Sequence, residues 1–157
     1  MKKLLVLALA LAACGPSSPP ATTPSPSSAA YGTSSARGAV EAFLAGVKAG
    51  DLQAISMVWG NEDGPVFERE DRQVLEQREL IMICYLKHDS ARVLDQVPSG
   101  QPNRPKFNIE LTRGDVTRTT TMTTARGPEG RWFVTDADVV AVRDFCQRPN
   151  SGAPPAR

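Results

Sequence analysis

The stretch VEAFLAGVKAGDL (40–52) decides how the folded part of this chain begins. Its apolar residues recur at the i, i+3, i+4, i+7 spacing of an amphipathic helix: Val40, Phe43, Leu44 and Val47. Gly50 suits the left-handed residue that ends such a helix, and Asp51 is a favourable N-cap for a second helix. Ser34 or Ser35 is the candidate N-cap of the first helix. The stretch therefore predicts two consecutive helices.

A third helix is predicted over residues 70–86, after a loop at 60–65 (GNEDGP). The first half of this helix is rich in charges, whereas its second half, 80–86 (LIMICYL), is apolar nearly all round. We therefore expect the second half to be buried and the first half to be solvated.

Beyond His88 the apolar residues alternate with a period of two, which favours strands. Four strands are predicted, at 93–97, 107–112, 116–125 and 132–142, the last with a bend near 136–138. Helices followed by antiparallel strands are typical of the α+β class. The predicted fold has three N-terminal helices packed on a curved, mostly antiparallel four-stranded sheet.

The N-terminal residues have the parts of an export signal. Lys2 and Lys3 form a basic start, 4–10 form an apolar segment, and 11–14 (LAAC) match a lipobox. The apolar segment is shorter than the roughly 20 residues that span a bilayer. The lipobox pattern implies a signal peptide at 1–13 and acyl chains, palmitate among them, on Cys14, which together anchor stably. An ordinary secretory signal and an uncleaved anchor are the alternatives.

This assignment predicts a lipoprotein of the bacterial cell envelope whose first partner is the membrane, through the lipid on Cys14. Gly15 in place of Asp is compatible with the outer membrane, with the protein facing the periplasm. Residues 14–35 are rich in Pro, Ser, Thr and Ala and predict a disordered tether. The α+β domain then occupies 36–148, and 149–157 form a frayed tail.

The charge balance excludes one class of partner. The full chain carries a net charge of +1, and loss of Lys2 and Lys3 with the signal leaves 16 Lys and Arg against 17 Asp and Glu. Nucleic-acid binding usually needs a basic patch, for which this near-balance gives no case.

Two cysteines remain once Cys14 is assigned to the lipid, namely Cys84 and Cys146. In an oxidising compartment two such residues favour an intramolecular disulfide. Two buried thiols are the alternative, and nothing in the spacing, which lacks Cys-x-x-Cys, indicates a redox site.

No metal site and no cofactor are predicted. His88 is the single histidine, and the aspartates near the end of the domain lack the spacing of a calcium loop. The segment 87–89 is expected to be a solvated helix end. An enzymatic alternative pairs His88 or Tyr85 with a carboxylate of the sheet, Asp95 or Glu110.

Two segments resemble nuclear transport factor 2-like domains, and in particular lumazine-binding-like lipoproteins. One is 40–52, an Ala-rich helix ending in Ala-Gly-Asp, and the other is 130–136 (GRWFVTD), a turn followed by Trp and alternating apolar residues. The resemblance implies a strongly bent sheet wrapped around helices as a cone, with a pocket at its open end. The alternative is an unrelated cone-like or cystatin-like α+β domain with the same order of elements.

Tyr85, Phe107 and Trp132 are expected in the core and would line such a pocket. No catalytic motif of the enzymatic family members matches this chain, so no catalytic residue is assigned. The favoured hypothesis is a non-enzymatic binding or scaffold module that takes a small apolar ligand or an envelope protein. An isomerase or cyclase that uses the pocket, and a module that forms a homodimer, are the alternatives.

Overall fold

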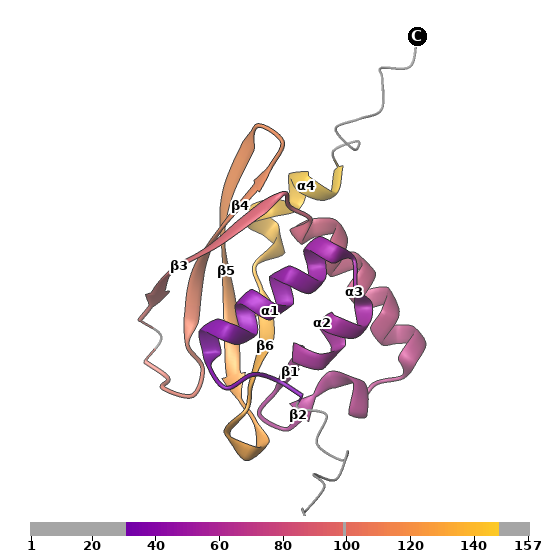
Figure 1. Ribbon diagram of the computed structural model, residues 1–157, viewed down its shortest axis with the longest axis vertical. Coiled ribbons are helices and arrows are strands. Elements are labelled where there is room, and N and C mark those ends of the chain that lie inside the picture. The colour runs from indigo at the N-terminus through magenta and orange to yellow at the C-terminus, as the bar shows by residue number, and fades with distance from the viewer. Residues whose placement is uncertain (1–30, 99, 148–157) are drawn as a thin grey trace, which may run out of the picture.

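A computed structural model describes residues 31–98 and 100–147 (Figure 1). The helices are α1 (Ala36–Ala49), α2 (Leu52–Val58), α3 (Arg72–Leu86) and α4 (Arg143–Gln147). The strands are β1 (Gly60–Asn61), β2 (Gly64–Pro65), β3 (Ser90–Val97), β4 (Lys106–Arg113), β5 (Val116–Arg126) and β6 (Trp132–Ala137). The predicted signal peptide, Cys14, most of the tether and the tail 149–157 lie outside the described residues.

The protein is an α+β domain in which one antiparallel sheet has the order β3-β4-β5-β6. Helix α1 lies across one face of this sheet, and α2 and α3 follow it on the same side (Figure 1). Strands β3 and β6 are the two edges. The outer side of β6 is covered by two single bridges, from Thr33 to Trp132 and from Trp59 to Val134.

The helix boundaries at the start of the domain follow the sequence prediction because they are set by local caps. Ser35 Oγ accepts a hydrogen bond from the Gly38 amide at 3.0 Å, and the Asp51 carboxylate accepts one from the Ala54 amide at 3.0 Å. Gly50 adopts φ 68°, the left-handed conformation that closes α1.

The expectation that three helices precede all strands was wrong, because only α1 and α2 do so. The predicted loop at 60–65 is a two-stranded hairpin, β1 with β2, placed before α3. The hairpin packs tightly against the sheet, since a Cβ on Gly60 would lie 2.5 Å from the Gly64 carbonyl oxygen and 2.8 Å from the Phe133 ring.

The last strand is shorter than predicted. Strand β6 ends at Ala137, and Asp138 accepts a hydrogen bond from the Val140 amide at 3.1 Å. This cap starts a 3₁₀ turn, Val139–Val142, which continues into α4. The turn buries Val142, and α4 buries Phe145 against the core.

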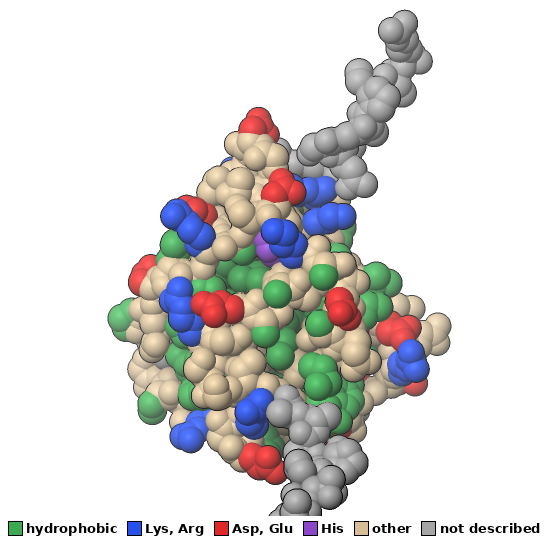
Figure 2. All heavy atoms as spheres, in the orientation of Figure 1, with side chains coloured by type: hydrophobic (Ala, Val, Ile, Leu, Met, Phe, Trp, Pro, Cys, Tyr) green, Lys and Arg blue, Asp and Glu red, His purple; other side chains and the backbone are tan. Residues whose placement is uncertain are grey.

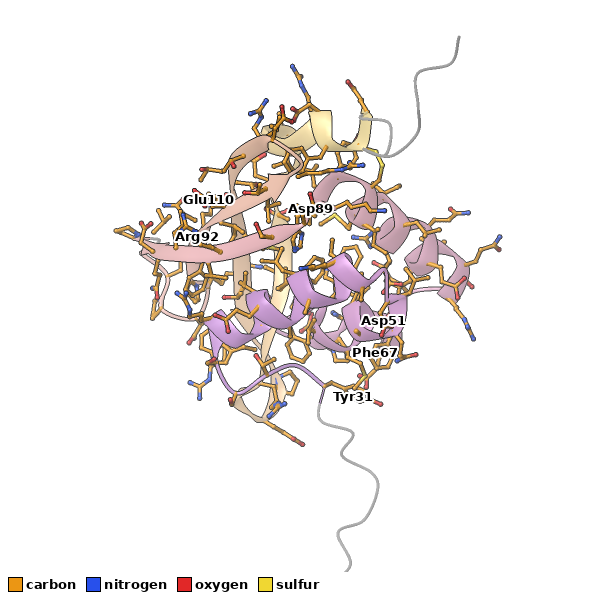
Figure 3. The ribbon with its side chains drawn as sticks, turned by 45° about the horizontal axis from the view of Figure 1, so that its top comes forward. Tyr31, Asp51, Phe67, Asp89, Arg92 and Glu110 are labelled. Atoms are coloured by element: carbon orange, nitrogen blue, oxygen red, sulfur yellow. A yellow bond between two sulfur atoms is a disulfide. The ribbon has the colours of Figure 1, made fainter. Side chains whose placement is uncertain are left out.

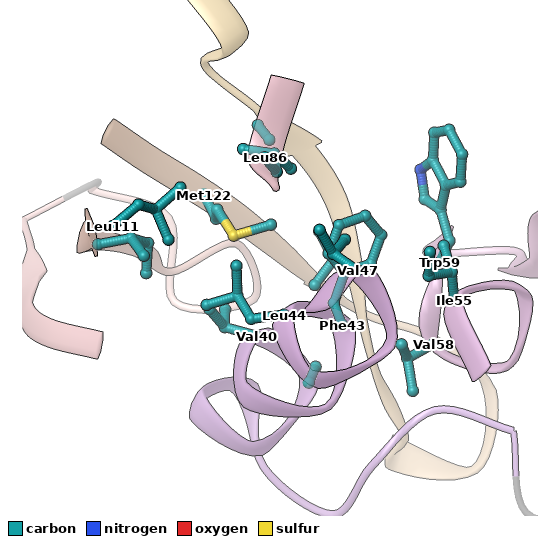
Figure 4. Packing of buried hydrophobic residues seen from close by; sticks show 14 of the residues in the cluster. Val40, Phe43, Leu44, Val47, Ile55, Val58, Trp59, Leu86, Leu111 and Met122 are labelled. Atoms are coloured by element: carbon teal, nitrogen blue, oxygen red, sulfur yellow. The ribbon is translucent and has the colours of Figure 1, made fainter. Parts of the chain in front are cut away.

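The core fills the space between the helices and the sheet (Figure 4). Helix α1 contributes Val40, Phe43, Leu44 and Val47, as the period of its sequence predicted. These side chains meet apolar residues of the sheet and of α2: Ile109, Leu111, Met122, Val134, Ile55 and Val58. Burial of this apolar surface is the main force that holds the helices on the sheet.

Helix α3 departs from its prediction. Leu80 and Ile81, expected in the core, are 56% and 54% exposed. The buried positions are Leu75, Glu79 and Leu86, with Met82 half-buried between them. They follow the spacing i, i+4, i+7, i+11 of one helical face. The periodicity of the helix, and not the apolar run, therefore determines which side faces the core.

Cys84 and Cys146 form a disulfide, with their Cα atoms 4.8 Å apart. The bond joins the end of α3 to α4 and closes the chain over a sequence separation of 62 residues. Within residues 31–98 and 100–147, no helix has the length and apolar character needed to cross a bilayer.

Candidate functional site

The three residues expected to line a pocket do not line any of the four grooves that the structure describes between residues 31 and 147. Phe107 is a core residue with 5% of its surface exposed, and Trp132 is half-buried on β6, bridged to Thr33. Tyr85 is half-buried on α3. The two grooves with the most distinctive polar groups are lined by other residues, and they flank α1 and α3.

The first groove, here the α1–β3 groove, runs between helix α1 and the edge strand β3 and has a volume of about 550 Å³. It is lined by Arg37, Glu41, Leu44, Ala45, Lys48, His88, Ala91, Arg92 and Val93. Four of these residues, at 37, 41, 44 and 48, follow one face of α1 at helical spacing. Figure 2 shows the histidine in a hollow, with a cationic side chain beside it and apolar side chains below.

His88 is the most unusual group of this groove. It follows the end of α3 and is only 5% exposed, although its neighbours Lys87 and Asp89 are exposed. The expected solvated helix end was therefore wrong for His88. Its Nδ1–H donates to the Leu86 carbonyl oxygen at 2.8 Å, which leaves Nε2 as the acceptor of the ring. Nε2 has no hydrogen-bond partner among the described residues and is available to the groove.

Burial lowers the pKa of His88 from its ordinary value of 6.5, because the charged imidazolium loses its hydration. The positive charge of Lys48 lowers this pKa further. The Leu86 hydrogen bond and the negative charge of Asp89 act in the opposite direction. The result is an imidazole that is neutral near pH 7.

Two of the three cations in the groove are already engaged. Arg37 pairs with Glu41 at 3.0 Å and donates to the carbonyl oxygens of Val93 and Leu94, at 2.5 and 3.0 Å. Arg37 thereby binds two carbonyl oxygens of the edge strand β3, next to the register shift between Val93 and Gln96.

Arg92 pairs across the strands with Glu110, at 2.6 Å (Figure 3). Lys48, in contrast, has no ion pair within the described part of the chain. The ammonium of Lys48 and Nε2 of His88 are thus the uncommitted polar groups of the α1–β3 groove. The apolar surface between them comes from Leu44, Ala91 and Val93.

The second groove, here the α2–α3 groove, lies between α2 and α3 and has a volume of about 420 Å³. It is lined by Leu52, Gln53, Ser56, Phe67, Arg72, Leu75, Glu76 and Glu79. The ring of Phe67 is held edge-on by Tyr31, with 4.9 Å between the ring centroids (Figure 3).

Glu79 is the buried group of the α2–α3 groove, with 1% of its surface exposed. Ser56 Oγ donates a hydrogen bond to its Oε1 atom. Burial raises the pKa of Glu79 from its ordinary value of 4.5, and the negative charge of Glu76 adds to this effect. The Ser56 hydrogen bond acts in the opposite direction.

The sequence did not single out Glu79, because it stands in the charged half of α3. The signal was present in the spacing, since Glu79 lies four residues after Leu75 and seven before Leu86 on the buried face. For His88 no local signal exists, because its burial depends on α1 packing over the loop that follows α3.

The pairings that the enzymatic alternative would use are not formed among the described residues. Glu110 is engaged by Arg92, and Asp95 accepts a hydrogen bond from Asn108 at 3.1 Å. No described hydrogen bond joins either carboxylate to His88 or Tyr85. Within the described ranges, no cluster of three or more His, Cys, Asp or Glu side chains has metal-binding geometry.

Comparison of the chain with family models, with curated proteins and with solved structures finds no significant match.

Proposed function

We propose that this chain is a lipid-anchored binding protein of the bacterial cell envelope and that its α1–β3 groove takes an amphipathic anion. The observation that carries the proposal is the pair of uncommitted groups, the Lys48 ammonium and His88 Nε2, beside an apolar wall. A carboxylic acid or acidic phosphate with a short apolar chain matches this arrangement.

The ligand class follows from the charges of the groove. Three cations, Arg37, Lys48 and Arg92, line it together with a single carboxylate, Glu41, which Arg37 already pairs. An anionic group is therefore favoured and a cationic one is repelled. Leu44 and Val93 supply the apolar contact that a chain of several methylenes needs.

The location rests on the N-terminal sequence. The basic start, the apolar segment and the lipobox at 11–14 support cleavage before Cys14, lipidation and a place in the envelope, with the outer membrane favoured by Gly15. The tether then holds the domain away from the bilayer, so that the groove is open to periplasmic solutes.

The likeness to nuclear transport factor 2-like domains remains part of this proposal. Helices α1 and α2 lie against the antiparallel sheet, and register shifts between Val93 and Gln96 and between Thr123 and Thr124 are of the kind that bends strands. Phe107 and Ile109, on the face of the sheet that the resemblance would assign to a pocket, are buried in the hydrophobic core. This burial favours a binding module over an isomerase or cyclase.

The test is calorimetric titration of the full-length protein with hexanoate, and with hexanamide as the uncharged counterpart. Hexanoate is expected to bind and hexanamide to bind at least about tenfold more weakly, because a charge-assisted hydrogen bond is lost. Lys48→Gln is expected to weaken hexanoate binding by a similar factor. Lys87→Gln, the same change of charge outside the groove, is the matched control. Equal affinities of the two ligands, or of the two variants, would contradict the proposal.

The anchor has its own test. Cys14→Ser is expected to abolish incorporation of labelled palmitate, while Cys84→Ser is expected to leave the labelling intact. Persistent labelling of the Cys14→Ser variant would remove the lipid anchor from the proposal.

A further inference from the structure

The α2–α3 groove shares no lining residue with the α1–β3 groove, and the balance of charged side chains in its lining has the opposite sign. Its charged lining groups are Arg72, Glu76 and Glu79, all on α3. The lining residues from α2 and from the turn before α3, which include Gln53, Ser56 and Phe67, are uncharged. The groove therefore carries an excess of negative charge.

The Glu79 carboxyl is held by one internal hydrogen bond and lines the groove, which is the arrangement of a group that binds a ligand. Oε1 accepts the Ser56 hydrogen bond, whereas Oε2 makes no hydrogen bond to any described residue, and the carboxyl lines the groove. Oε2 is also not a sealed, unpartnered atom, because Glu70 Oε2 is the one such atom in the described part of the chain. Glu79 is 1% exposed and lines the groove, so its carboxyl lies at the floor of the groove.

No cation of the described residues pairs with this carboxyl. Arg72, the cation of the groove, is engaged by Glu76 at 2.8 Å, and Arg78 is engaged by Glu70. A buried carboxylate is costly unless a positive charge or several donors compensate it. A cationic group that enters from solvent would provide that compensation.

The walls of the groove suit the apolar part of such a ligand. Leu52 and Leu75 present aliphatic surface, and Phe67 presents an aromatic ring fixed by its edge-on contact with Tyr31. An aromatic ring beside carboxylates is a common recognition site for ammonium groups.

We propose that the α2–α3 groove binds a small organic amine as its ammonium ion, with the Glu79 carboxylate as counter-ion and Phe67, Leu52 and Leu75 against the apolar body. This site is independent of the α1–β3 groove. Neutral molecules of the same shape lack the charge that Glu79 compensates, and anions are repelled by Glu76 and Glu79.

The test uses 2-phenylethylamine, with 2-phenylethanol as the uncharged counterpart, titrated into the full-length protein at about pH 8, where a primary amine is still protonated. Amide chemical shifts locate the binding. The amine is expected to shift the resonances of Gln53, Ser56 and Phe67 and to bind at least about tenfold more tightly than the alcohol.

Two variants separate the charge of Glu79 from the fold. Glu79→Gln keeps the shape and an acceptor for Ser56, and it is expected to weaken amine binding at least about tenfold. Gln53→Lys places an ammonium at the exposed rim of the groove without touching the core, and it is expected to block the amine. Glu129→Gln, an exposed carboxylate in the β5–β6 turn, is the control for net charge and is expected to bind as the wild type does.

Three outcomes would overturn the inference. The first is no binding of the amine, and the second is equal binding of amine and alcohol. The third is an affinity that neither Glu79→Gln nor Gln53→Lys changes. Because the amine carries the wrong charge for the α1–β3 groove, failure here leaves hexanoate binding at Lys48 and His88 untouched, and the reverse also holds.

Discussion

His88 and Glu79 are both buried, both ionisable and both held by a single internal hydrogen bond, yet they lie in grooves of opposite character. His88 donates to the Leu86 carbonyl, and Glu79 accepts from Ser56. Burial lowers the pKa of the first and raises the pKa of the second, because in each case it disfavours the charged form.

The neighbouring charges reinforce burial in both grooves. Lys48 lowers the pKa of His88, and Glu76 raises the pKa of Glu79. Each buried group thus has a neighbouring side chain of its own sign in the groove, Lys48 for His88 and Glu76 for Glu79. A ligand of the opposite sign satisfies both the buried group and its neighbour, which is why the two grooves are expected to select ligands of opposite charge.

Helix α3 lines the α2–α3 groove and leads directly into His88 of the α1–β3 groove, so the largest effect is expected from loosening that helix. Glu79 lies within α3, His88 follows its end, and Cys84 ties it to α4. Replacing Cys84 and Cys146 by Ser is expected to lower the free energy of unfolding by about 4 kcal/mol, since a loop of this length is no longer closed in the unfolded chain.

Denaturant unfolding of the double variant, and of the wild type with and without reductant, measures this loss. Both grooves are expected to weaken together, because α3 positions both. A double variant as stable as the oxidised wild type would show that packing alone fixes α3.

A smaller loss is expected from Ser56→Ala, which acts on one groove only. Removal of the hydroxyl leaves a buried oxygen of Glu79 without its donor, and the expected cost is about 1–3 kcal/mol. The pKa of Glu79 is expected to rise further, because the hydrogen bond that lowers it is gone. Chemical denaturation measures the cost, and Ser34→Ala, an exposed serine, is the control. An unchanged stability would mean that the Ser56 hydroxyl does not support Glu79.

The pH dependence of stability separates the two groups by sign. Since the pKa of folded His88 lies below 6.5, the unfolded chain takes up a proton first as the pH falls through that value. His88 therefore removes stability on acidification. Since the pKa of folded Glu79 lies above 4.5, the unfolded chain ionises first as the pH rises through that value, and Glu79 removes stability on alkalinisation.

His88→Asn is accordingly expected to reduce the loss of stability below about pH 6.5, and Glu79→Gln to reduce the loss above about pH 4.5. Each unit of pKa displacement contributes about 1.4 kcal/mol. Unfolding curves collected across the acid range give both effects, with Glu129→Gln as the control. If both variants changed the pH dependence of stability in the same direction, the opposite contributions of His88 and Glu79 would be contradicted.

The smallest effect on stability is expected from Lys48→Gln, within about 0.5 kcal/mol, because Lys48 is exposed and has no ion pair in the described structure. Its effect on His88 is specific, however. The pKa of His88 is expected to rise when the positive charge is removed. NMR titration of the imidazole measures that change, and an unaltered pKa would place Lys48 outside the site.

The sequence predicted those parts of the fold that local chemistry controls. Ser35, Gly50 and Asp51 act as caps within a few residues of their partners, so the boundaries of α1 and α2 were predictable. The disulfide was predictable from the two cysteines that remain once Cys14 is assigned to the predicted lipobox.

The parts that the sequence missed depend on contacts between distant segments. The apolar run at 80–86 suggested burial, but the face of α3 that packs on the core is chosen by Leu75 and Leu86, and this choice exposes Leu80 and Ile81 and buries Glu79. Strand β6 ends early because Asp138 caps the turn that follows it. The prediction extended this strand to residue 142 because valines continue beyond Asp138. Both candidate grooves lie between elements whose packing the local sequence does not determine.

The central claim is that the α1–β3 groove holds a neutral imidazole whose free nitrogen faces an acidic ligand, and the single histidine allows a direct test. The pKa of His88 is measured by NMR in the full-length protein alone, with saturating hexanoate and with hexanamide. The account predicts a pKa below 6.5 in the free protein, a rise with hexanoate, because a nearby carboxylate stabilises the imidazolium, and no change with hexanamide. A pKa at or above 6.5 in the free protein, or one that hexanoate leaves unchanged, would contradict it.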